Sequence, residues 1–203
     1  MLRHSDRQIW RMLVDFCIEG KAYRINDCDC KGTAGKVGGY SLEIRKASMG
    51  DWEEIRKIYA DARQFMAEHG NAGQWGNSYP QEELLLGDIA QEKLYVCTEK
   101  TVAAVFYFAR EEDPTYRVIE DGAWLNDAAY GVVHRIASAR TVRGAASFCL
   151  DWAFRQTGNI RIDTHRDNLP MQNMLKKNGF HYCGKIYLEN GEPRIAFQKI
   201  CAV

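Results

Sequence analysis

The residues from Arg143 to Ser147 have the composition of a helix start that can bind a phosphate. The segment reads Arg-Gly-Ala-Ala-Ser, and it lies between the β-branched run 131–137 and the amphipathic run 148–157. This order predicts a strand, a small-residue loop and a helix. Small residues let the backbone approach a ligand, while the amides of the first helical turn, the helix dipole and the Arg143 side chain attract an anion. A helix that merely packs tightly against a strand begins with the same residue types. Other parts of the chain must therefore decide between a phosphate-binding helix start and an ordinary packed helix.

Three side chains are candidates for proton transfer. His134 lies on the predicted strand 131–137, Glu120 precedes that strand, and Tyr182 lies on a later one. Histidine titrates near neutral pH and burial tunes glutamate, so His134 and Glu120 are the candidate bases. Tyr182 is the candidate acid. The alternatives are a half-buried structural histidine, a solvated loop glutamate and a core tyrosine.

A glycine-containing loop carries candidate substrate-binding residues. Gln74, Trp75 and Tyr79 place an amide and two aromatic rings beside Gly73 and Gly76. Aromatic walls suit an amine with an apolar body, or a cation. The same rings would also serve to pin a long loop onto the core.

Composition favours one globular domain with an extension. The chain has 203 residues, of which 46% are hydrophobic, and its 27 basic residues equal its 27 acidic ones. This balance gives no net field for nucleic acid or an anionic membrane, so neither is expected as a partner. We expect a helical extension and linker over residues 1–39, with a helix near 5–19 and a linker at 31–39, followed by one domain over 40–203.

The cysteines do not predict a metal site. There are seven, and the close pair Cys28 and Cys30 has no second pair or nearby histidine to complete a zinc set. Asp15 and Glu19 interrupt the early apolar run, so no signal peptide is expected. A reducing cytoplasm is the expected location.

Periodicity predicts a mixed α/β (α+β) fold in the order β-α-α-β-β-β-α-β-α-β-β. Ser48 and Asp51 form a capping box before the first helix, Gly158 and Gly179 end the last two helices, and Asn190-Gly191 forms a hairpin turn. The predicted helices cover about 52–65, 82–90, the run from the Arg143 segment to Gly158, and 170–178. The predicted strands cover 40–45, 94–98, 102–109, 131–137, 160–165, 182–188 and 194–200.

Three motifs in this order resemble the GCN5-related N-acetyltransferase (GNAT) superfamily. The segment 141–146 matches both small positions of the family's pyrophosphate loop but has Thr141 in place of its first Gln or Arg. The strand 160–165 is followed by Asn168 at a helix start, and 174–180 resembles the family's helix end before a Gly-Phe pair. The resemblance covers about residues 40–200 and implies a mostly antiparallel sheet flanked by helices.

The resemblance also implies a site for acetyl-CoA. Strand 133–138 would splay from its neighbour, so that the backbone of Ile136, Ala137 and Ser138 contacts pantetheine. The pyrophosphate would lie on Arg143, Gly144, Ala145, Ala146 and Ser147, and Asn168 would contact the CoA arm. Many members carry a tyrosine acid four residues before the Gly of the Gly-Phe pair, where this chain has Leu175.

The expected activity is therefore acetyl transfer from acetyl-CoA to the primary amine of a small molecule or peptide, directly within a ternary complex and without a metal. Two alternatives remain open, a regulatory or partner-binding module that binds acyl-CoA with little turnover, and an acyltransferase for a longer acyl-CoA. A homo-oligomer is compatible with the sequence.

Overall fold

One eight-stranded sheet organises the protein. The computed structural model describes residues 33–201, so the expected helix near 5–19 and the Cys28–Cys30 pair lie outside the described residues. The strand order is β1-β2-β3-β4-β5-β6-β8-β7, and every neighbouring pair is antiparallel except the parallel pair β5–β6. The strands are β1 (Thr33–Val37), β2 (Tyr40–Lys46), β3 (Leu94–Thr98), β4 (Val102–Ala109), β5 (Gly131–Ser138), β6 (Asn159–Thr164), β7 (His181–Tyr187) and β8 (Pro193–Ile200).

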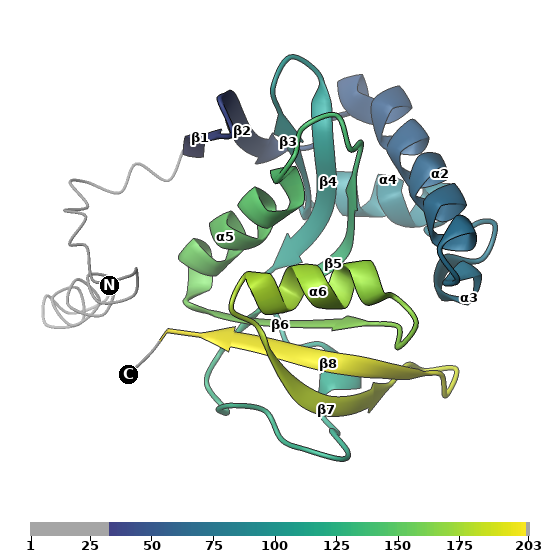
Figure 1. Ribbon diagram of the computed structural model, residues 1–203, viewed down its shortest axis with the longest axis vertical. Helices are drawn as coiled ribbons and strands as arrows, with labels where there is room; N and C mark the ends of the chain where they lie inside the picture. The colour runs from purple at the N-terminus through teal and green to yellow at the C-terminus, as the bar shows by residue number, and fades with distance from the viewer. Residues whose placement is uncertain (1–32, 202–203) are drawn as a thin grey trace, which may run out of the picture.

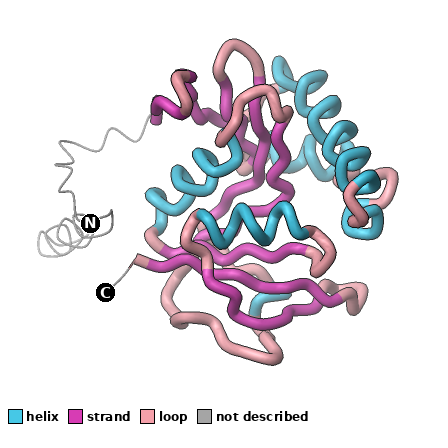
Figure 2. Tube along the Cα trace, viewed as in Figure 1, coloured by secondary structure: helices cyan, strands magenta, loops and turns pink. Residues whose placement is uncertain are grey.

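Helices cover both faces of the sheet, which confirms the predicted fold class (Figures 1 and 2). They are α2 (Trp52–Glu68), α3 (Ala72–Trp75), α4 (Glu82–Ala90), α5 (Ala145–Thr157) and α6 (Leu169–Lys177), with short 3-10 turns η1 (Met49–Asp51) and η2 (Pro114–Tyr116). Helix α5 buries Leu150 and Ala153 against β4 and β6, while α2 and α4 cover the opposite face through Ile55, Ile58 and Leu85. The sheet is therefore packed against helices on both faces.

The start of the sheet corrects the predicted linker. Residues 33–37, expected within the linker at 31–39, form β1 and pair with β2 across the two-residue turn Gly38-Gly39. Both glycines have positive φ, 57° and 91°, which the tight turns that join antiparallel strands require. The run Thr-Ala-Gly-Lys-Val lacks the apolar alternation that identifies a strand, so the pattern gave no signal. The short α3 was also not predicted.

The predicted caps and turns agree with the structure. Ser48 and Asp51 form the capping box, now at the start of η1. Gly158 caps α5 in the left-handed conformation, and Gly179, with φ 78°, follows Asn178, the C-cap of α6. Asn190 and Gly191 lie in the turn between β7 and β8. No helix among residues 33–201 is long and apolar enough to cross a membrane.

A long loop, residues 110–130, packs under the sheet around the fully buried Tyr116. Its close approach depends on Gly122, because a Cβ atom there would lie 2.0 Å from the carbonyl oxygen of Cys183.

Replacing Gly122 by alanine will therefore destabilise the protein. The added methyl group meets backbone, which cannot rotate away, so we expect a loss of about 2 kcal/mol or more in the free energy of unfolding. Gly87 is the matched control, since it lies inside α4 and a Cβ atom there would meet nothing within 4 Å. Gly87→Ala will be neutral or stabilising by up to ~1 kcal/mol. Urea unfolding of both variants measures the difference, and equal stabilities would contradict the close approach.

Candidate active site

The two halves of the sheet separate between β5 and β6. Only two residue pairs join these strands, Gly131 with Ile160 and Val132 with Arg161. Beyond them β5 continues to Ser138 and β6 to Thr164, and Figure 1 shows β5 and β6 running in different directions. A cavity of about 560 Å³ occupies this wedge, with walls from both strands, the α2–α4 connection, the start of α6 and the β7–β8 turn. The splayed strand predicted from the resemblance is thus present.

A β-bulge shapes β5 at the mouth of the wedge. His134 pairs with Tyr107 and Ala137 with Val105, so that Arg135 and Ile136 together face Phe106. Arg135 has φ 51°, in the left-handed region that L side chains rarely adopt. Bulges of this kind redirect side chains next to active sites.

Buried polar groups hold the bulge in place. The Tyr59 hydroxyl donates to the Arg135 carbonyl at 2.9 Å, and Arg135 Nη2 lies 2.6 Å from Asp88 Oδ2. Both charged side chains are at most 10% exposed. Burial raises the pKa of Asp88, opposed by the charge of Arg135. The conformation of the strand beside His134 is therefore fixed by packing from α2 and α4.

His134 lies between two carboxylates on the cavity wall. Its Nε2 is 2.9 Å from Asp113 Oδ2, and its Nδ1 is 3.8 Å from Asp163 Oδ1. Asp163 Oδ1 accepts a hydrogen bond from the buried Tyr116 hydroxyl at 2.7 Å. The backbone amide and the hydroxyl of Thr115 both donate to Asp113 Oδ1, at 2.8 and 2.6 Å. Every carboxylate in this cluster has a fixed orientation, which is what a proton-transfer site requires.

The electrostatics of Asp113 favour its ionised form. Burial raises the pKa of this carboxyl, but the contact with His134 and the hydrogen bonds from Thr115 outweigh burial and hold the pKa at about 2. An ionised Asp113 stabilises positive charge on the His134 ring.

Asp113 will also make folding stability depend on acid pH. Its folded pKa, about 2, lies below the ordinary value of 3.8 that the unfolded chain is expected to show. The stabilisation is therefore present above about pH 4 and is lost as the pH falls towards 2. Wild-type protein will be more stable than the Asp113→Asn variant at pH 6, and the difference will shrink between pH 5 and pH 2. Urea unfolding across this range tests it, and a constant difference would contradict an ionised, paired Asp113.

The predicted substrate-binding loop reaches the cavity. Gln74, Trp75 and Tyr79 all lie on its wall, and Trp75 packs edge-on against Tyr59 with ring centroids 5.7 Å apart. The Asn168 side chain donates to Gln74 Oε1 at 2.8 Å. This bond joins the loop to the start of α6 across the wedge. Trp75 is both a wall and a core residue, since it is only 8% exposed.

The predicted cofactor residues divide into two groups. Ile136 and Asn168 lie on the cavity wall, whereas Ala137 is buried in the core and Ser138 donates to the Ala103 carbonyl at 3.3 Å. Asn168 is fixed as the cap of α6, accepting from the Met171 amide at 3.1 Å.

The predicted pyrophosphate residues form the start of α5, outside the walls of the cavity. Gly144, with φ 90°, is the N-cap, Ala145 and Ala146 begin the helix, and the Arg143 side chain is exposed. Ser147 accepts a hydrogen bond from Asn178 at 3.0 Å. A Cβ atom at Gly144 would lie 2.9 Å from the Val37 side chain, so only glycine fits there without a shift.

The structure does not bring Glu120 and Tyr182 to the cavity. Glu120 is exposed, pairs through its backbone with Lys185, and accepts a hydrogen bond from Tyr187. Tyr182 is 50% exposed and contacts Phe197. Glu120 lies where the long loop meets β7, because the loop passes under the sheet before β5 begins. Leu175, at the position of the usual tyrosine acid, is fully buried.

Two residues on the cavity wall, Asp113 and Thr164, were not predicted from the sequence. The order Asp113-Pro114-Thr115 is typical of a capped turn, and the structure shows that cap as well, so the pattern gave no sign of a second role. Thr164 is 1% exposed on the cavity wall, and its hydroxyl has no hydrogen-bond partner among the described residues. A buried polar atom of this kind marks a place where a ligand can supply the missing bond.

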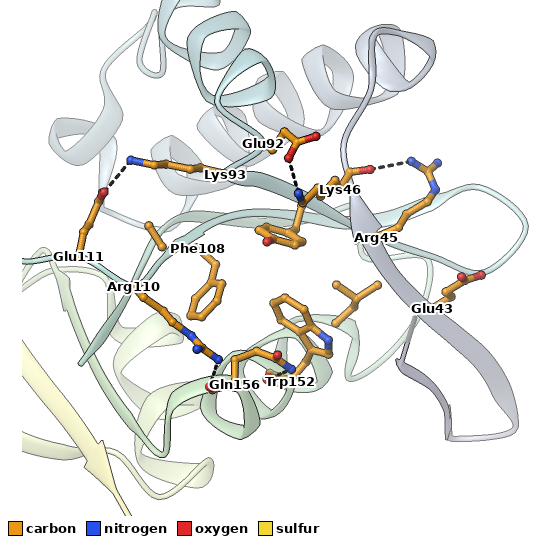
Figure 3. Close-up of a pocket in the computed structure, with 13 residues that line it drawn as sticks. Glu43, Arg45, Lys46, Glu92, Lys93, Phe108, Arg110, Glu111, Trp152 and Gln156 are labelled. Atoms are coloured by element: carbon orange, nitrogen blue, oxygen red, sulfur yellow. Dashed lines mark hydrogen bonds and ion pairs between the residues drawn. The ribbon is translucent and has the colours of Figure 1, made fainter. Parts of the chain in front are cut away.

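A larger cavity, about 870 Å³, lies between β2, β3, β4 and α5 (Figure 3). Trp152 and Phe108 point into it, and several of its charged side chains form ion pairs with one another. Lys93 pairs with Glu111, and Lys46 with Glu92. No histidine is among the described residues that line this cavity.

Solved structures share this fold. An acetyltransferase of the GNAT family from Streptococcus agalactiae 2603 is 30% identical, with a TM-score of 0.73 over 80% of this chain and 96% of that one. A second, from Listeria monocytogenes 4b F2365, is 19% identical with a TM-score of 0.61 over 82% and 99%. A protein from Salmonella typhimurium, described with its cofactor acetyl-CoA, is 15% identical with a TM-score of 0.50 over 77% and 92%.

No protein-family model matches the chain, and no curated protein matches its sequence. The identity and coverage of the Streptococcus structure, together with the splayed β5–β6 pair, decide the assignment. The chain belongs to the GNAT family of acetyltransferases.

Proposed function

We propose that this protein is an acetyl-CoA-dependent N-acetyltransferase that transfers the acetyl group directly to a primary amine within a ternary complex. The observation that carries the proposal is His134, held between Asp113 and Asp163 inside the wedge between β5 and β6. A proton acceptor in the wedge where we propose that acetyl-CoA binds is what amine acetylation requires.

The chain has features that fit acetyl-CoA, which would supply the activated acetyl thioester. The free edges of β5 and β6 flank the wedge, and Ile136 lies on its wall. The orphan Thr164 hydroxyl lies on the same wall and would gain a partner from the pantetheine arm. Helix α5, which is 13 residues long, would receive the pyrophosphate at its start, where Arg143 is exposed. A Salmonella protein of the same fold is described with this cofactor.

His134 is the proposed general base. With its proton on Nε2, towards Asp113, the ring presents the lone pair of Nδ1 on the side of Asp163. An ammonium group entering the wedge would be attracted by the Asp163 carboxylate and would give a proton to His134 Nδ1. The imidazolium that results is stabilised by Asp113, whose pKa of about 2 keeps it ionised. The neutral amine is then ready to attack.

We propose that the bulge at Arg135 fixes the orientation of the backbone amides of β5. Because Tyr59 and Asp88 fix the backbone and side chain of Arg135, the neighbouring amides of β5 keep one orientation. Amides that are fixed before reaction stabilise a carbonyl oxygen as it gains negative charge.

Release of free thiol from acetyl-CoA in the presence of primary amines tests the proposal. We expect thiol release that depends on both the amine and His134. Binding of acetyl-CoA without thiol release for any amine would favour a regulatory binding module instead. Faster release from propionyl-CoA or succinyl-CoA would assign a longer acyl donor.

A further inference from the structure

We infer that the acceptor is a zwitterion, an amine that also carries a carboxylate, and that Arg194 binds this carboxylate. The inference rests on the proposed function and names the substrate class of the same site. It arises from a buried guanidinium on the cavity wall that the proton-transfer cluster does not use.

Arg194 lies on the same face of the sheet as Asp163. In the β6–β8 ladder Asp163 pairs with Ala196, and Arg194 is two residues from Ala196 along β8. Side chains two residues apart on a strand point to the same face, and such diagonal neighbours are separated by about 7 Å. Arg194 and Asp163 form no ion pair with each other among the described residues, and both line the same cavity, so one ligand that carries both charges can contact the two together.

The guanidinium is buried but incompletely paired. Arg194 is 6% exposed, Nη2 lies 3.0 Å from Glu192 Oε2, and Nη1 donates to the Pro193 carbonyl at 3.2 Å. The remaining N–H groups of the fork have no hydrogen-bond partner among the described residues. Two parallel N–H groups of arginine match the two oxygens of a carboxylate, which makes this the ligand that such a fork prefers.

Glu192 is a replaceable partner for Arg194. Its side chain is 52% exposed and lies next to the Asn190-Gly191 turn, so its carboxylate can move into solvent at little cost. In the absence of acceptor it occupies the position that a substrate carboxylate would take. The acceptor carboxylate would displace it, because a bond inside the cavity is less screened by water than one at an exposed side chain.

The rest of the cavity suits the other parts of a zwitterion. Asp163 and His134 lie where the ammonium would bind, and Trp75, Tyr79 and Leu188 supply apolar wall. An amine without a carboxylate would bind Asp163 and His134 but would not contact Arg194, which would keep its ion pair with Glu192. We therefore expect α-amino acids to be better acceptors than the matching carboxamides.

The test compares the twenty protein amino acids with their carboxamides, using thiol release from acetyl-CoA at limiting acceptor. Wild-type protein will use at least one amino acid with a kcat/KM at least 10-fold above that of its carboxamide. In Arg194→Gln this ratio will fall to near 1, mainly through KM, while kcat/KM for the carboxamide will change less than 3-fold. Arg194→Lys, which keeps the charge, will restore part of the preference.

Variants of the β7–β8 turn supply the matched control. Glu192→Gln removes the internal competitor and will lower KM for the amino acid two- to fivefold. Glu189→Gln, an exposed glutamate in the same turn that does not line the cavity, will leave KM unchanged. Carboxamides that are used as well as amino acids, or an Arg194→Gln variant that impairs both equally, would overturn the inference.

The experiment gives different results if the transferase activity is absent and if the carboxylate site is absent. If no amine releases thiol, the same panel is measured by thermal unfolding, since a ligand of the folded state raises its stability. Stabilisation by an amino acid but not its carboxamide, lost in Arg194→Gln, would support the carboxylate site without transferase activity. Stabilisation by neither would overturn the site as well.

Discussion

Replacing His134 by glutamine will lower kcat about 10²- to 10⁴-fold, the range that a positioned general base contributes. Glutamine keeps a polar side chain of similar length but cannot take a proton from the ammonium. Because His134 lies beside Asp113 and Asp163 on the wall of the wedge, the loss will be in turnover. Stabilisation by acetyl-CoA in thermal unfolding will remain within experimental error of the wild type.

His165 provides a matched control for this variant. It follows the neighbouring strand β6, is 23% exposed, and lies 3.5 Å from Asp167, so it is also a half-buried histidine beside a carboxylate. It does not line the cavity. His165→Gln will keep kcat within about threefold of the wild type, a change well below that expected of a general base. Equal activity of the two variants would remove His134 from the mechanism and leave solvent as the base.

Reversing the charge of Arg143 will weaken acetyl-CoA binding by about tenfold or more. Arg143 is exposed just before α5, where the helix start and the guanidinium would attract the pyrophosphate. In Arg143→Glu a carboxylate faces the same anion, and charge-assisted hydrogen bonds are worth about 1.5–3 kcal/mol. Calorimetric titration with acetyl-CoA measures the dissociation constant directly.

The other end of the same helix supplies the control for Arg143. Arg155 lies in the last turn of α5, 3.2 Å from Asp151. Arg155→Glu makes the same change in net charge, so it controls for a general effect on an anionic ligand. We expect its dissociation constant for acetyl-CoA to stay near that of the wild type. Equal weakening in both variants would mean that the pyrophosphate does not lie at the start of α5.

Much of the fold followed from the sequence because most elements bury one face and have clear ends. Helix α4 and strands β3 and β4 have the predicted boundaries, and Gly158 ends α5 as expected. Strand β1 escaped prediction because it is an edge strand of small and polar residues, formed by pairing across Gly38-Gly39.

The site was less predictable because its residues meet only through the fold. His134 and the Gln74, Trp75 and Tyr79 loop could be proposed from residue type, and all four lie on the cavity wall. Asp113 is 21 residues before His134, at the start of a long loop whose path depends on the packing of Tyr116 under the sheet. The spacing of residues in the sequence does not indicate this path, so the position of Asp113 beside His134 could not be predicted.

Glu120 was proposed from its position in the sequence, and this position was misleading. It precedes β5 in the sequence, which suggested proximity to His134, but the loop carries it to Lys185 on β7 instead. Arg194 gave no signal either, since an arginine in an alternating strand is typical of a solvent-facing position. The structure buries it on the cavity wall, next to residues of the β7–β8 turn.

Free thiol release from acetyl-CoA, measured with a panel of primary amines for wild type, His134→Gln and His165→Gln, tests whether His134 is the general base of an acetyl transfer. We expect release that requires an amine, is retained in His165→Gln and falls at least 100-fold in His134→Gln, the lower end of what a general base contributes. Stabilisation of the wild type by acetyl-CoA without amine-dependent thiol release would contradict it, and would leave a GNAT fold that binds its ligand without transferring the acetyl group.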